Sequence, residues 1–280
     1  MLRIGCVKYL NARPLNRGWP GEVEFDHPSA LCKRVANGEL DVALVSSFEF
    51  LRNPIYRIID FVSISSDGPV YSVVVAHRGE ISEIDEIGLD PASETAVNLL
   101  RCLLAEVGFN PRLVQRNTGV SPAAAESCSA SRAQLLIGDQ AIRFRHSHTG
   151  KFQFWDLGER WKKLIGFPFV YALWLIRPEV AHAQTIANKL RVLRDVNLAN
   201  LDQLIAEVVA GVVLSHPSPK AEADDLGLRE QLNQQFFARY YGKHLRFSFG
   251  KKEKQGLRTF ANLCVKHGLL EKGDLRFNLV

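Results

Sequence analysis

The stretch Leu2-Arg3-Ile4-Gly5-Cys6-Val7-Lys8-Tyr9-Leu10-Asn11-Ala12-Arg13-Pro14 decides the fold class, because a short apolar run passes directly into a polar loop. Residues 2–7 are predicted to form a buried strand, and residues 8–14 the loop that follows it. Short apolar runs then alternate with helical patterns over the first ninety residues. That alternation is typical of an α/β fold, in which helices cover a sheet of strands.

The same alternation continues in a second unit, and the chain ends in helices. The predicted strands are 2–7, 41–45, 56–59, 62–65, 70–76, 86–89, 112–114, 133–138 and 169–176. The predicted helices are 28–37 with Ser29 as N-cap, 47–51, 96–107, 122–127, 140–144, 179–195, 198–213, 221–241 and 251–267. Residues 151–161 fit neither pattern and are predicted to be irregular.

Two α/β units followed by helices predict a two-lobed type II periplasmic-binding-protein-like fold, with a mixed sheet flanked by helices in each lobe. The β-prone segments 70–76 and 169–176 are the candidates for the two crossings between the lobes. Lobe one then comprises residues 1–78 and 174–280, and lobe two comprises residues 79–173. A ligand cleft is expected between the lobes.

The composition is that of an ordinary globular chain, with 280 residues, 46% hydrophobic and 23% charged. The net charge of +5 suits a small anion or plain surface solvation, and no dense basic block predicts nucleic acid binding. Five widely spaced cysteines without a C-x-x-C pair give no support to a zinc or redox site. Neither a leader nor a membrane-spanning apolar run is evident, so we expect a cytoplasmic protein.

Asn11 is the first candidate for ligand binding. Ligands of open α/β sheets bind outside the carboxyl ends of the strands, and Asn11 follows the first predicted strand. Its amide donates and accepts hydrogen bonds without ionising, so it can hold a hydroxyl or a carboxylate at any pH. The alternative, which stays open here, is that Asn11 shapes the turn before Pro14.

Small hydroxyl residues stand at two predicted strand-to-helix junctions, Ser46 with Ser47 and Ser93 with Thr95. A helix N-terminus presents free amides and a partial positive charge, so such junctions receive carboxylates well. Taken singly, each junction fits helix capping better. One junction from each lobe favours a shared anion-binding cleft.

Three further residues lie near predicted strand ends or on a crossing strand. Gly138 lets the backbone approach a ligand closely. Asp139 is either a general base or, the interpretation we favour, a helix cap. Ser72 lies within the predicted strand 70–76, where it can bond a ligand between the lobes or simply fill a buried position.

Other candidate chemistry finds less support. His146 and His148 lack carboxylate spacing, so a solvated loop is favoured over a metal site. The aromatic cluster of Trp161, Phe167, Phe169 and Trp174 could wall a cleft for a ring-shaped ligand, although core packing is the safer interpretation. No G-x-S-x-G elbow, P-loop or G-x-G-x-x-G motif supports hydrolase or nucleotide chemistry. The residues alone therefore predict a two-lobed binder of a small anion, with no cofactor indicated and no reaction specified.

Seven motifs carry a resemblance that spans nearly the whole chain: residues 4–15, 38–45, 68–73, 135–141, 156–161, 166–170 and 255–260. The first contains Tyr9-Leu10-Asn11-Ala12-Arg13-Pro14-Leu15, and the fourth contains Ile137-Gly138-Asp139-Gln140-Ala141. In combination they resemble the chorismate dehydratases of the futalosine route to menaquinone. The resemblance implies the type II binding-protein fold.

The resemblance also implies a lyase reaction that removes water from chorismate to give 3-[(1-carboxyvinyl)oxy]benzoate, with no cofactor or metal. It implies Asn11 and Ser72 as the reactive pair, which would bind the leaving hydroxyl or a substrate carboxylate. The residues predicted to bind the substrate are Tyr9, Ser46, Ser47, Ser93, Thr95, Gly138 and Asp139. The substrate's own enolpyruvyl carboxylate is the candidate base, which would account for the missing His or Glu.

One departure concerns carboxylate binding, because the family commonly has Ser-Arg-Thr-Ser where this chain has Ser93-Glu94-Thr95-Ala96. Lys8 and Arg13 are candidates to compensate. Two alternatives stay open: the dihydroxynaphthoate synthase of the same pathway, and a non-catalytic small-anion-binding protein of a transporter. The Tyr-Leu-Asn-x-x-Pro-Leu signature favours the dehydratase, and the missing leader argues against the transporter. The sequence predicts no oligomeric state.

Overall fold

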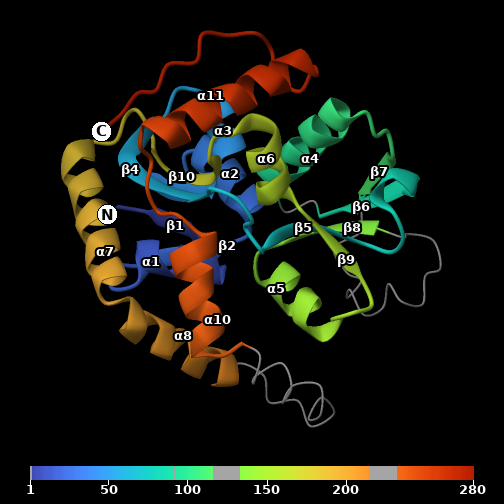
Figure 1. Cartoon of the computed structure of the whole chain (residues 1–280). Coiled ribbons are helices and arrows are strands. Elements are labelled where there is room, and N and C mark those ends of the chain that lie inside the picture. Colours follow the sequence, from blue (N-terminus) through green and yellow to red (C-terminus); the bar gives the residue numbers. More distant parts are fainter. Residues whose placement is uncertain (1, 91–92, 116–132, 215–231) are drawn as a thin grey trace.

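The computed structural model describes residues 2–90, 93–115, 133–214 and 232–280, which form two lobes (Figure 1). The first lobe is built on a mixed sheet in the order β2-β1-β3-β10-β4. Its strands are β1 (Ile4–Val7), β2 (Val23–Asp26), β3 (Val42–Ser46), β4 (Arg57–Ser66) and β10 (Phe169–Ile176). Strand β1 is parallel to β2 and β3, and β10 is antiparallel to β3 and β4. The central strands are buried on both faces, which explains their continuous apolar runs.

The second lobe is built on a second mixed sheet, in the order β7-β6-β8-β5-β9. Its strands are β5 (Val73–His77), β6 (Glu86–Leu89), β7 (Arg112–Gln115), β8 (Ala133–Ile137) and β9 (Gln153–Asp156). Strand β6 is parallel to β7 and β8, whereas β5 is antiparallel to β8 and β9. The two-lobed α/β fold with mixed sheets is therefore confirmed.

Helices cover both sheets. The first lobe carries α1 (Arg13–Asn16), α2 (Pro28–Ala36), α3 (Ser47–Arg52), α7 (Ala183–Ala199), α8 (Leu201–Leu214), α10 (Gln234–Arg239) and α11 (Lys251–Lys266). The second carries α4 (Glu94–Val107), α5 (Gly138–Ser147) and α6 (Leu157–Ile165). Short turns of 3-10 helix are η1 (Leu10–Ala12) and η2 (Ile81–Glu83), and η4 (Tyr240–His244) is a π-helical turn. Helix α11 packs on β10 and also on α4, so it lies over both lobes (Figure 1).

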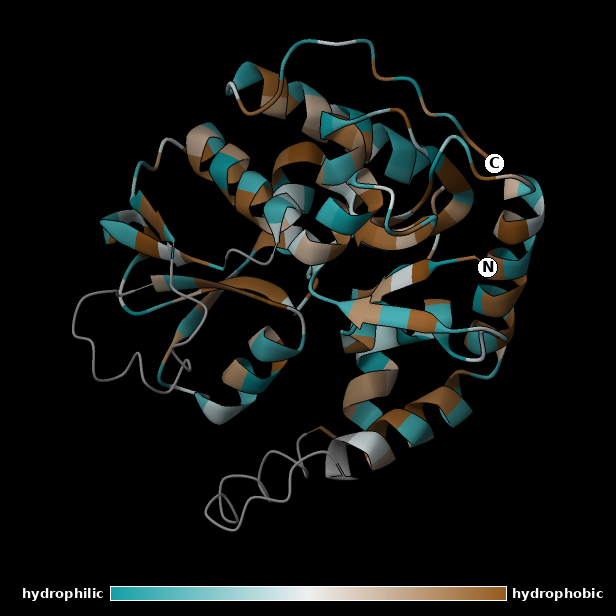
Figure 2. Cartoon of the chain, turned by 180° about the vertical axis from the view of Figure 1, so that it is seen from behind, coloured by the Kyte–Doolittle hydropathy of each residue, from teal (hydrophilic) through white to brown (hydrophobic). Residues whose placement is uncertain are grey.

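Apolar strands lie inside and the helices present mixed faces, as the hydropathy colouring shows (Figure 2). Within the described residues, we find no helix long and apolar enough to span a bilayer. Trp161, Phe169 and Trp174 of the predicted aromatic cluster pack into the core. The rings of Trp161 and Phe169 are 5.0 Å apart at their centroids, and that of Phe260 lies 4.9 Å from Phe169. All three are fully buried, so core packing is the correct interpretation for this group.

Strand pairing locates the crossings between the lobes. Strand β5 belongs to the second sheet and β10 to the first, so the chain has crossed before Val73 and has returned before Phe169. The lobe bounds at 78 and 174 stay a prediction, and the sheets suggest crossings a few residues earlier. Ser72 accordingly precedes β5 and does not lie within it.

Several elements differ from the sequence predictions. Strands predicted at 56–59 and 62–65 form the single strand β4, which contains an irregularity at Phe61 (φ 65°). Residues 151–161 are not irregular but form β9 and the start of α6. The edge strand β2 was not predicted, because it is short and only partly buried. The predicted helix 122–127 lies outside the described residues, as does most of 221–241.

Two predicted local roles are also wrong. The N-cap position of α2 is occupied by His27, without a side-chain cap bond, and Pro28 is the first helical residue, so Ser29 is not the N-cap. His146 and His148 do not lie in a solvated loop, because they belong to the C-terminal end of α5. The His146 Nε2 atom is 3.1 Å from the Tyr71 hydroxyl, and the His148 ring stacks on Phe144.

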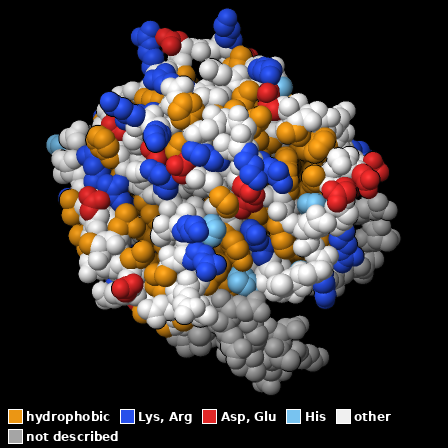
Figure 3. Space-filling view, viewed as in Figure 1, with side chains coloured by type: hydrophobic (Ala, Val, Ile, Leu, Met, Phe, Trp, Pro, Cys, Tyr) orange, Lys and Arg blue, Asp and Glu red, His pale blue; other side chains and the backbone are white. Residues whose placement is uncertain are grey.

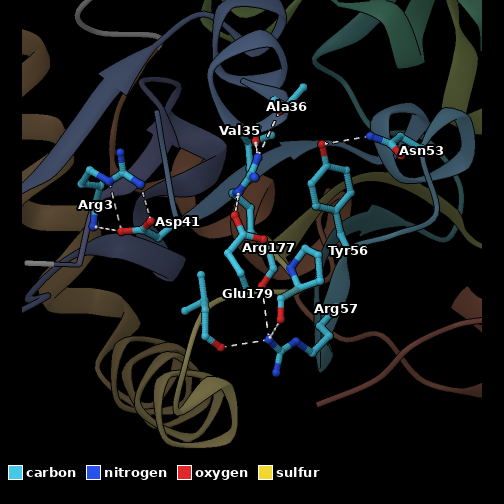
Figure 4. Close-up of polar contacts among 11 residues, drawn as sticks. Arg3, Val35, Ala36, Asp41, Asn53, Tyr56, Arg57, Arg177 and Glu179 are labelled. Carbon is cyan, nitrogen blue, oxygen red and sulfur yellow. Dashed lines mark hydrogen bonds and ion pairs between the residues drawn. The ribbon is translucent and has the colours of Figure 1, made fainter. Parts of the chain in front are cut away.

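Two arginines donate hydrogen bonds to backbone carbonyls of the first lobe near the end of β10 (Figure 4). Arg177 Nη1 donates to the carbonyls of Val35 (2.6 Å) and Ala36 (3.1 Å) at the end of α2. Arg57 donates to the carbonyl of Val180 (2.9 Å) beyond the same strand. These bonds join the C-terminal ends of α2 and β10, where the Val35 carbonyl also accepts from the Gly38 N–H (3.3 Å).

Candidate active site

A narrow cavity of about 60 Å³ lies between the two lobes. Its apolar walls include Val7 and Ala172 from the first sheet and Val73 and Ile137 from the second. The polar lining consists of amide, hydroxyl and phenol groups, which belong to Tyr9, Asn11, Ser46, Ser72, Ser93, Thr95 and Tyr171. Among the described residues that line it, none is Asp, Glu, Lys, Arg or His. On the outer face in Figure 3, by contrast, basic and acidic side chains are interspersed.

Asn11 lies in η1, directly after β1, and its side chain lines the cavity. Its Oδ1 atom is buried and has no hydrogen-bond partner within the described part of the chain. Leaving a buried acceptor unpaired costs about 1–3 kcal/mol, so such atoms in a folded protein call for an explanation. A ligand hydroxyl that donates to Oδ1 would remove this cost.

Leu10, the residue before Asn11, has both of its backbone polar groups hydrogen-bonded to side chains. The Leu10 N–H donates to Asp139 Oδ1 of the second lobe (2.9 Å), and the Leu10 carbonyl accepts from the Tyr241 hydroxyl (2.8 Å). Asp139 is therefore a cross-lobe acceptor, whereas α5 begins at the N-cap Ile137 without a side-chain cap bond. The prediction that Asp139 caps this helix is wrong. Burial raises the pKa of Asp139 to about 6, against the opposing effects of the Leu10 N–H and Arg143.

Ser72 stands where the chain enters the second lobe, and its position is fixed by its neighbours. Its Oγ accepts from the Tyr240 hydroxyl (2.8 Å), and its carbonyl accepts from the Gly138 N–H (2.8 Å). The preceding residue, Tyr71, has φ 68°, a left-handed conformation that costs a non-glycine residue energy. Asp156 holds that segment, because its Oδ2 accepts from the Tyr71 N–H (2.8 Å).

Hydroxyl groups of the two lobes meet at a second point of the cavity. Thr95 Oγ1 is hydrogen-bonded to Ser46 Oγ and accepts from the Phe48 N–H (3.1 Å). Ser93 caps α4, because its Oγ accepts from the Ala96 N–H (3.2 Å). The two junctions predicted to share an anion cleft therefore lie in contact.

The close approach of the Tyr9 ring to the backbone requires a glycine at position 138. It has φ 55°, and a Cβ atom at this position would lie 2.9 Å from the Cγ atom of the Tyr9 ring. A side chain there would therefore push the ring away and strain the backbone. Burial raises the pKa of the Tyr9 phenol well above its usual range, so its hydroxyl stays protonated.

Two residues predicted to bind the ligand do not line the cavity. Ser47 is fully buried, and its Oγ donates to the Val170 carbonyl (2.7 Å) in the core of the first lobe. Asp139 is not among the lining residues, and its carboxylate accepts from the N–H of Leu10, the residue before Asn11. The remaining predicted residues, Tyr9, Asn11, Ser46, Ser72, Ser93, Thr95 and Gly138, are brought together around the cavity.

Glu94, which stands where the family commonly has an arginine, forms an ion pair outside the cavity. Glu94 pairs with Arg52 of the first lobe at 3.0 Å, outside the cavity lining. Lys8 and Arg13 are exposed and also lie outside that lining, so they do not replace the missing arginine within it. A carboxylate in the cavity would therefore be met by hydroxyl, phenol and amide donors.

Three tyrosines near the cavity were missed by the sequence analysis. Tyr171 lines it from β10, with its hydroxyl 3.2 Å from Ser66 Oγ. Tyr240 and Tyr241 reach Ser72 and Leu10 from the π-helical turn. For metal binding, a search of the described ranges finds no group of three or more His, Cys, Asp or Glu able to hold an ion.

The sequence is similar to proteins of menaquinone biosynthesis. The sequence profile of a family described as menaquinone biosynthesis matches residues 2–266. A chorismate dehydratase from Thermus thermophilus is 29% identical over 277 residues, which cover 92% of this chain and 93% of the relative.

Solved structures share the fold at low sequence identity. An Archaeoglobus fulgidus protein superposes with a TM-score of 0.61 at 16% identity, covering 96% of this chain and 98% of its own. The alkanesulfonate-binding protein of Xanthomonas axonopodis, bound to MOPS, has a TM-score of 0.56 at 16% identity, covering 97% and 94%. The periplasmic aliphatic sulphonate binding protein of Escherichia coli has a TM-score of 0.57 at 14% identity, covering 97% and 88%. These likenesses show the periplasmic-binding-protein fold.

Proposed function

Because the chain belongs to the menaquinone biosynthesis family, we propose that it acts as a chorismate dehydratase, a carbon–oxygen lyase that converts chorismate to 3-[(1-carboxyvinyl)oxy]benzoate and water. The similarity to the Thermus thermophilus enzyme supports this substrate. The observation in the site that carries the proposal is the buried, unpartnered Asn11 Oδ1 in a cavity whose described lining is uncharged. Such a site suits a reaction whose substrate brings its own acid–base group.

The proposed reaction breaks two bonds to ring carbons, C3–H and C4–O. The C3 hydrogen leaves as a proton, which the ring carboxylate activates through the adjacent double bond. The electron pair of the C3–H bond forms the new C3–C4 double bond, and the C4 hydroxyl leaves. The ring becomes aromatic, and the proton and hydroxide together make the water released. The enolpyruvyl carboxylate of the substrate is the proposed base.

The protein then has to hold a dianion and assist the leaving hydroxyl. We assign the leaving hydroxyl to Asn11 and Ser72, whose side chains line the cavity. We assign a carboxylate to the junction of Ser46, Ser93 and Thr95, where the N-terminus of α4 adds backbone donors. Because none of these side chains ionises near neutral pH, they stay available to the substrate throughout that range.

The proposal includes a cytoplasmic location. It is supported by Cys6, Cys32, Cys102 and Cys264, which are free and buried thiols. Chorismate, as a small dianion, is the proposed partner molecule.

The proposal is tested by incubating purified protein with chorismate and following products by mass spectrometry. We expect a product lighter than chorismate by one water, with the mass of 3-[(1-carboxyvinyl)oxy]benzoate. Binding without turnover would contradict the proposal and would favour the alternative of an anion-binding protein.

Replacement of Asn11 by alanine sharpens this test. We expect Asn11→Ala to fold normally and to lose turnover by at least about 100-fold, a typical effect of removing one transition-state hydrogen bond. The matched control is Asn188→Ala on the exposed side of α7, which should retain the activity of the unmodified protein. Full activity in Asn11→Ala would refute the assignment of this residue.

A further inference from the structure

Two consecutive tyrosines occupy the π-helical turn that follows α10. Tyr240 is 0% exposed and Tyr241 is 2% exposed, so both side chains are enclosed by protein. Each ring stacks on the phenylalanine four residues earlier in α10, Tyr240 on Phe236 (5.9 Å) and Tyr241 on Phe237 (6.1 Å). These contacts hold both rings, so each hydroxyl group has a fixed direction. π-Helical turns of this kind are frequent at functional sites.

The Tyr240 hydroxyl is directed at Ser72. It donates to Ser72 Oγ at 2.8 Å. Burial keeps the pKa of Tyr240 far above neutrality, so the phenol retains its proton and acts as the donor. Ser72 therefore uses one acceptor lone pair on Tyr240. Among the described residues, the acceptor for its own proton is the Val70 carbonyl at 3.5 Å, too long for a strong bond, so this proton can turn to a ligand.

The Tyr241 hydroxyl is directed at the other member of the proposed reactive pair. It donates at 2.8 Å to the carbonyl of Leu10, which belongs to the peptide bond that joins Leu10 to Asn11. The orientation of that peptide sets the direction in which the Asn11 side chain leaves the backbone. Tyr241 therefore fixes the residue whose Oδ1 is buried in the cavity without a partner.

From these contacts we infer that Tyr240 and Tyr241 are paired positioning residues, Tyr240 orienting the Ser72 hydroxyl as a donor to the leaving hydroxyl and Tyr241 holding the backbone of Asn11. This inference rests on the proposed function. One turn of the C-terminal region thereby sets the geometry of two reactive side chains that lie 61 positions apart in the sequence, at 11 and 72.

The inference is tested with Tyr240→Phe and Tyr241→Phe, which keep the rings and remove only the hydroxyl groups. We expect kcat for chorismate dehydration to fall roughly tenfold in each, about the effect of one hydrogen bond, with KM changed less than about twofold. The split arises because the orientation of Ser72 and Asn11 matters most when the C4–O bond breaks. Tyr56→Phe is the matched control, since Tyr56 is equally buried and its hydroxyl donates to Glu49 away from the cavity.

A double-mutant cycle separates positioning from a general loss of packing. If Tyr240 acts through Ser72, Tyr240→Phe should lower the residual turnover of a Ser72→Ala variant by less than about twofold. A full tenfold loss in that background would overturn the inference, as would Tyr240→Phe with the kcat of the unmodified protein. An equal loss in Tyr56→Phe would also overturn it. Absence of turnover in the unmodified protein would contradict the proposed function. If the unmodified protein turns over chorismate but the tyrosine variants do not behave as expected, only the positioning inference fails.

Discussion

Two of the zones in which the lobes meet, the lining of the cavity and the surroundings of α4, differ in chemistry. At the cavity, the cross-lobe contacts are made largely by hydroxyl groups, such as Ser46 with Thr95 and Tyr240 with Ser72. Along α4, away from the cavity, the lobes are joined by the ion pairs Arg52–Glu94 and Lys266–Glu106. The cavity zone is buried, whereas the α4 zone is open to solvent at several side chains.

This difference indicates how the proposed dianion site can do without cationic side chains in its described lining. Charges at the cavity would need partners in the absence of ligand, because burying an unpaired charge is costly. Hydroxyl groups can instead bond one another and rotate toward a carboxylate when it arrives. The charged pairs of the α4 zone lie where water screens them and where each adds little stability. Asp139 is the exception, since its buried carboxyl group takes part in the cavity zone.

The largest effect is expected from Asp139→Asn, which replaces the buried carboxyl group of the cavity zone by an amide. The amide oxygen can still accept from the Leu10 N–H. Burial raises the pKa of Asp139 from 3.8 to about 6. The folded protein thus holds a proton that the unfolded chain has released, so stability falls as pH rises from about 4 to about 6. A shift of this size corresponds to about 3 kcal/mol. Asp139→Asn should therefore be more stable than the unmodified protein near pH 8, by up to that amount.

Chemical denaturation between about pH 4 and pH 8 measures this difference. The advantage of Asp139→Asn should shrink toward zero as the pH falls through 6, because the native carboxyl group then becomes neutral as well. The exposed residue Asp85 provides the control for the same substitution, and Asp85→Asn should lack the gain in stability near pH 8. An advantage that does not vary with pH would show that Asp139 is not the buried acid of this zone.

Gly138→Ala tests whether the cavity zone depends on the close approach of Tyr9. The new Cβ would lie 2.9 Å from the ring of Tyr9, so the ring must move. Since a displacement of about 1 Å in an active site costs about 100-fold in rate, we expect a loss of that order in kcat/KM. Gly150→Ala is the matched control, because Gly150 also has positive φ but nothing lies within 4 Å of the added Cβ. Equal activities in the two variants would contradict the role given to Gly138.

Much of the cavity zone could be predicted from the sequence, because its residues follow strands with local signals. Asn11, Ser46 and Gly138 stand at the ends of apolar runs, and the fold brings such ends together. The D-x-x-E spacing of Asp156 and Glu159 was a signal for α6 that we did not use. Asp156 indeed caps that helix, since its Oδ1 accepts from the Glu159 N–H at 3.1 Å.

The rest could not be predicted, because it depends on contacts between distant segments. Tyr240 and Tyr241 have the appearance of helix core residues, and no local pattern tells that their hydroxyl groups reach Ser72 and Leu10. The role of Asp139 was assigned wrongly for a similar reason. Capping is the usual role of an acidic residue at a helix start, but here the carboxyl group reaches Leu10 in the other lobe.

A smaller effect is expected from Thr95→Val, which removes the hydroxyl group that both lobes share. The Phe48 N–H and the Ser46 hydroxyl would lose their partner, and an unsatisfied buried group costs about 1–3 kcal/mol. We expect the free energy of unfolding to fall by about 1–2 kcal/mol and KM for chorismate to rise roughly tenfold. Thr259→Val on α11, where the hydroxyl bonds only the Gln255 carbonyl of its own helix, should leave KM unchanged. An unchanged KM in Thr95→Val would remove this junction from the substrate site.

The smallest effect is expected in the α4 zone, from Glu106→Gln. Hydrogen bonds from Lys266 and then His267 lower the pKa of Glu106, so its contribution is present above its usual value of 4.5 and disappears in more acidic solution. Because the Lys266 side chain is 60% exposed, we expect a loss of less than about 1 kcal/mol near neutral pH, with kcat and KM unchanged.

High salt should abolish even the small Glu106→Gln difference, since it screens exposed charges but hardly affects buried hydroxyl contacts. Salt should therefore separate the two zones: denaturation in about 1 M salt should leave the Thr95→Val deficit in place while the Glu106→Gln deficit vanishes. A Glu106→Gln deficit that survives salt, or one that comes with a changed KM, would mean that the charged zone also sets the geometry of the cavity.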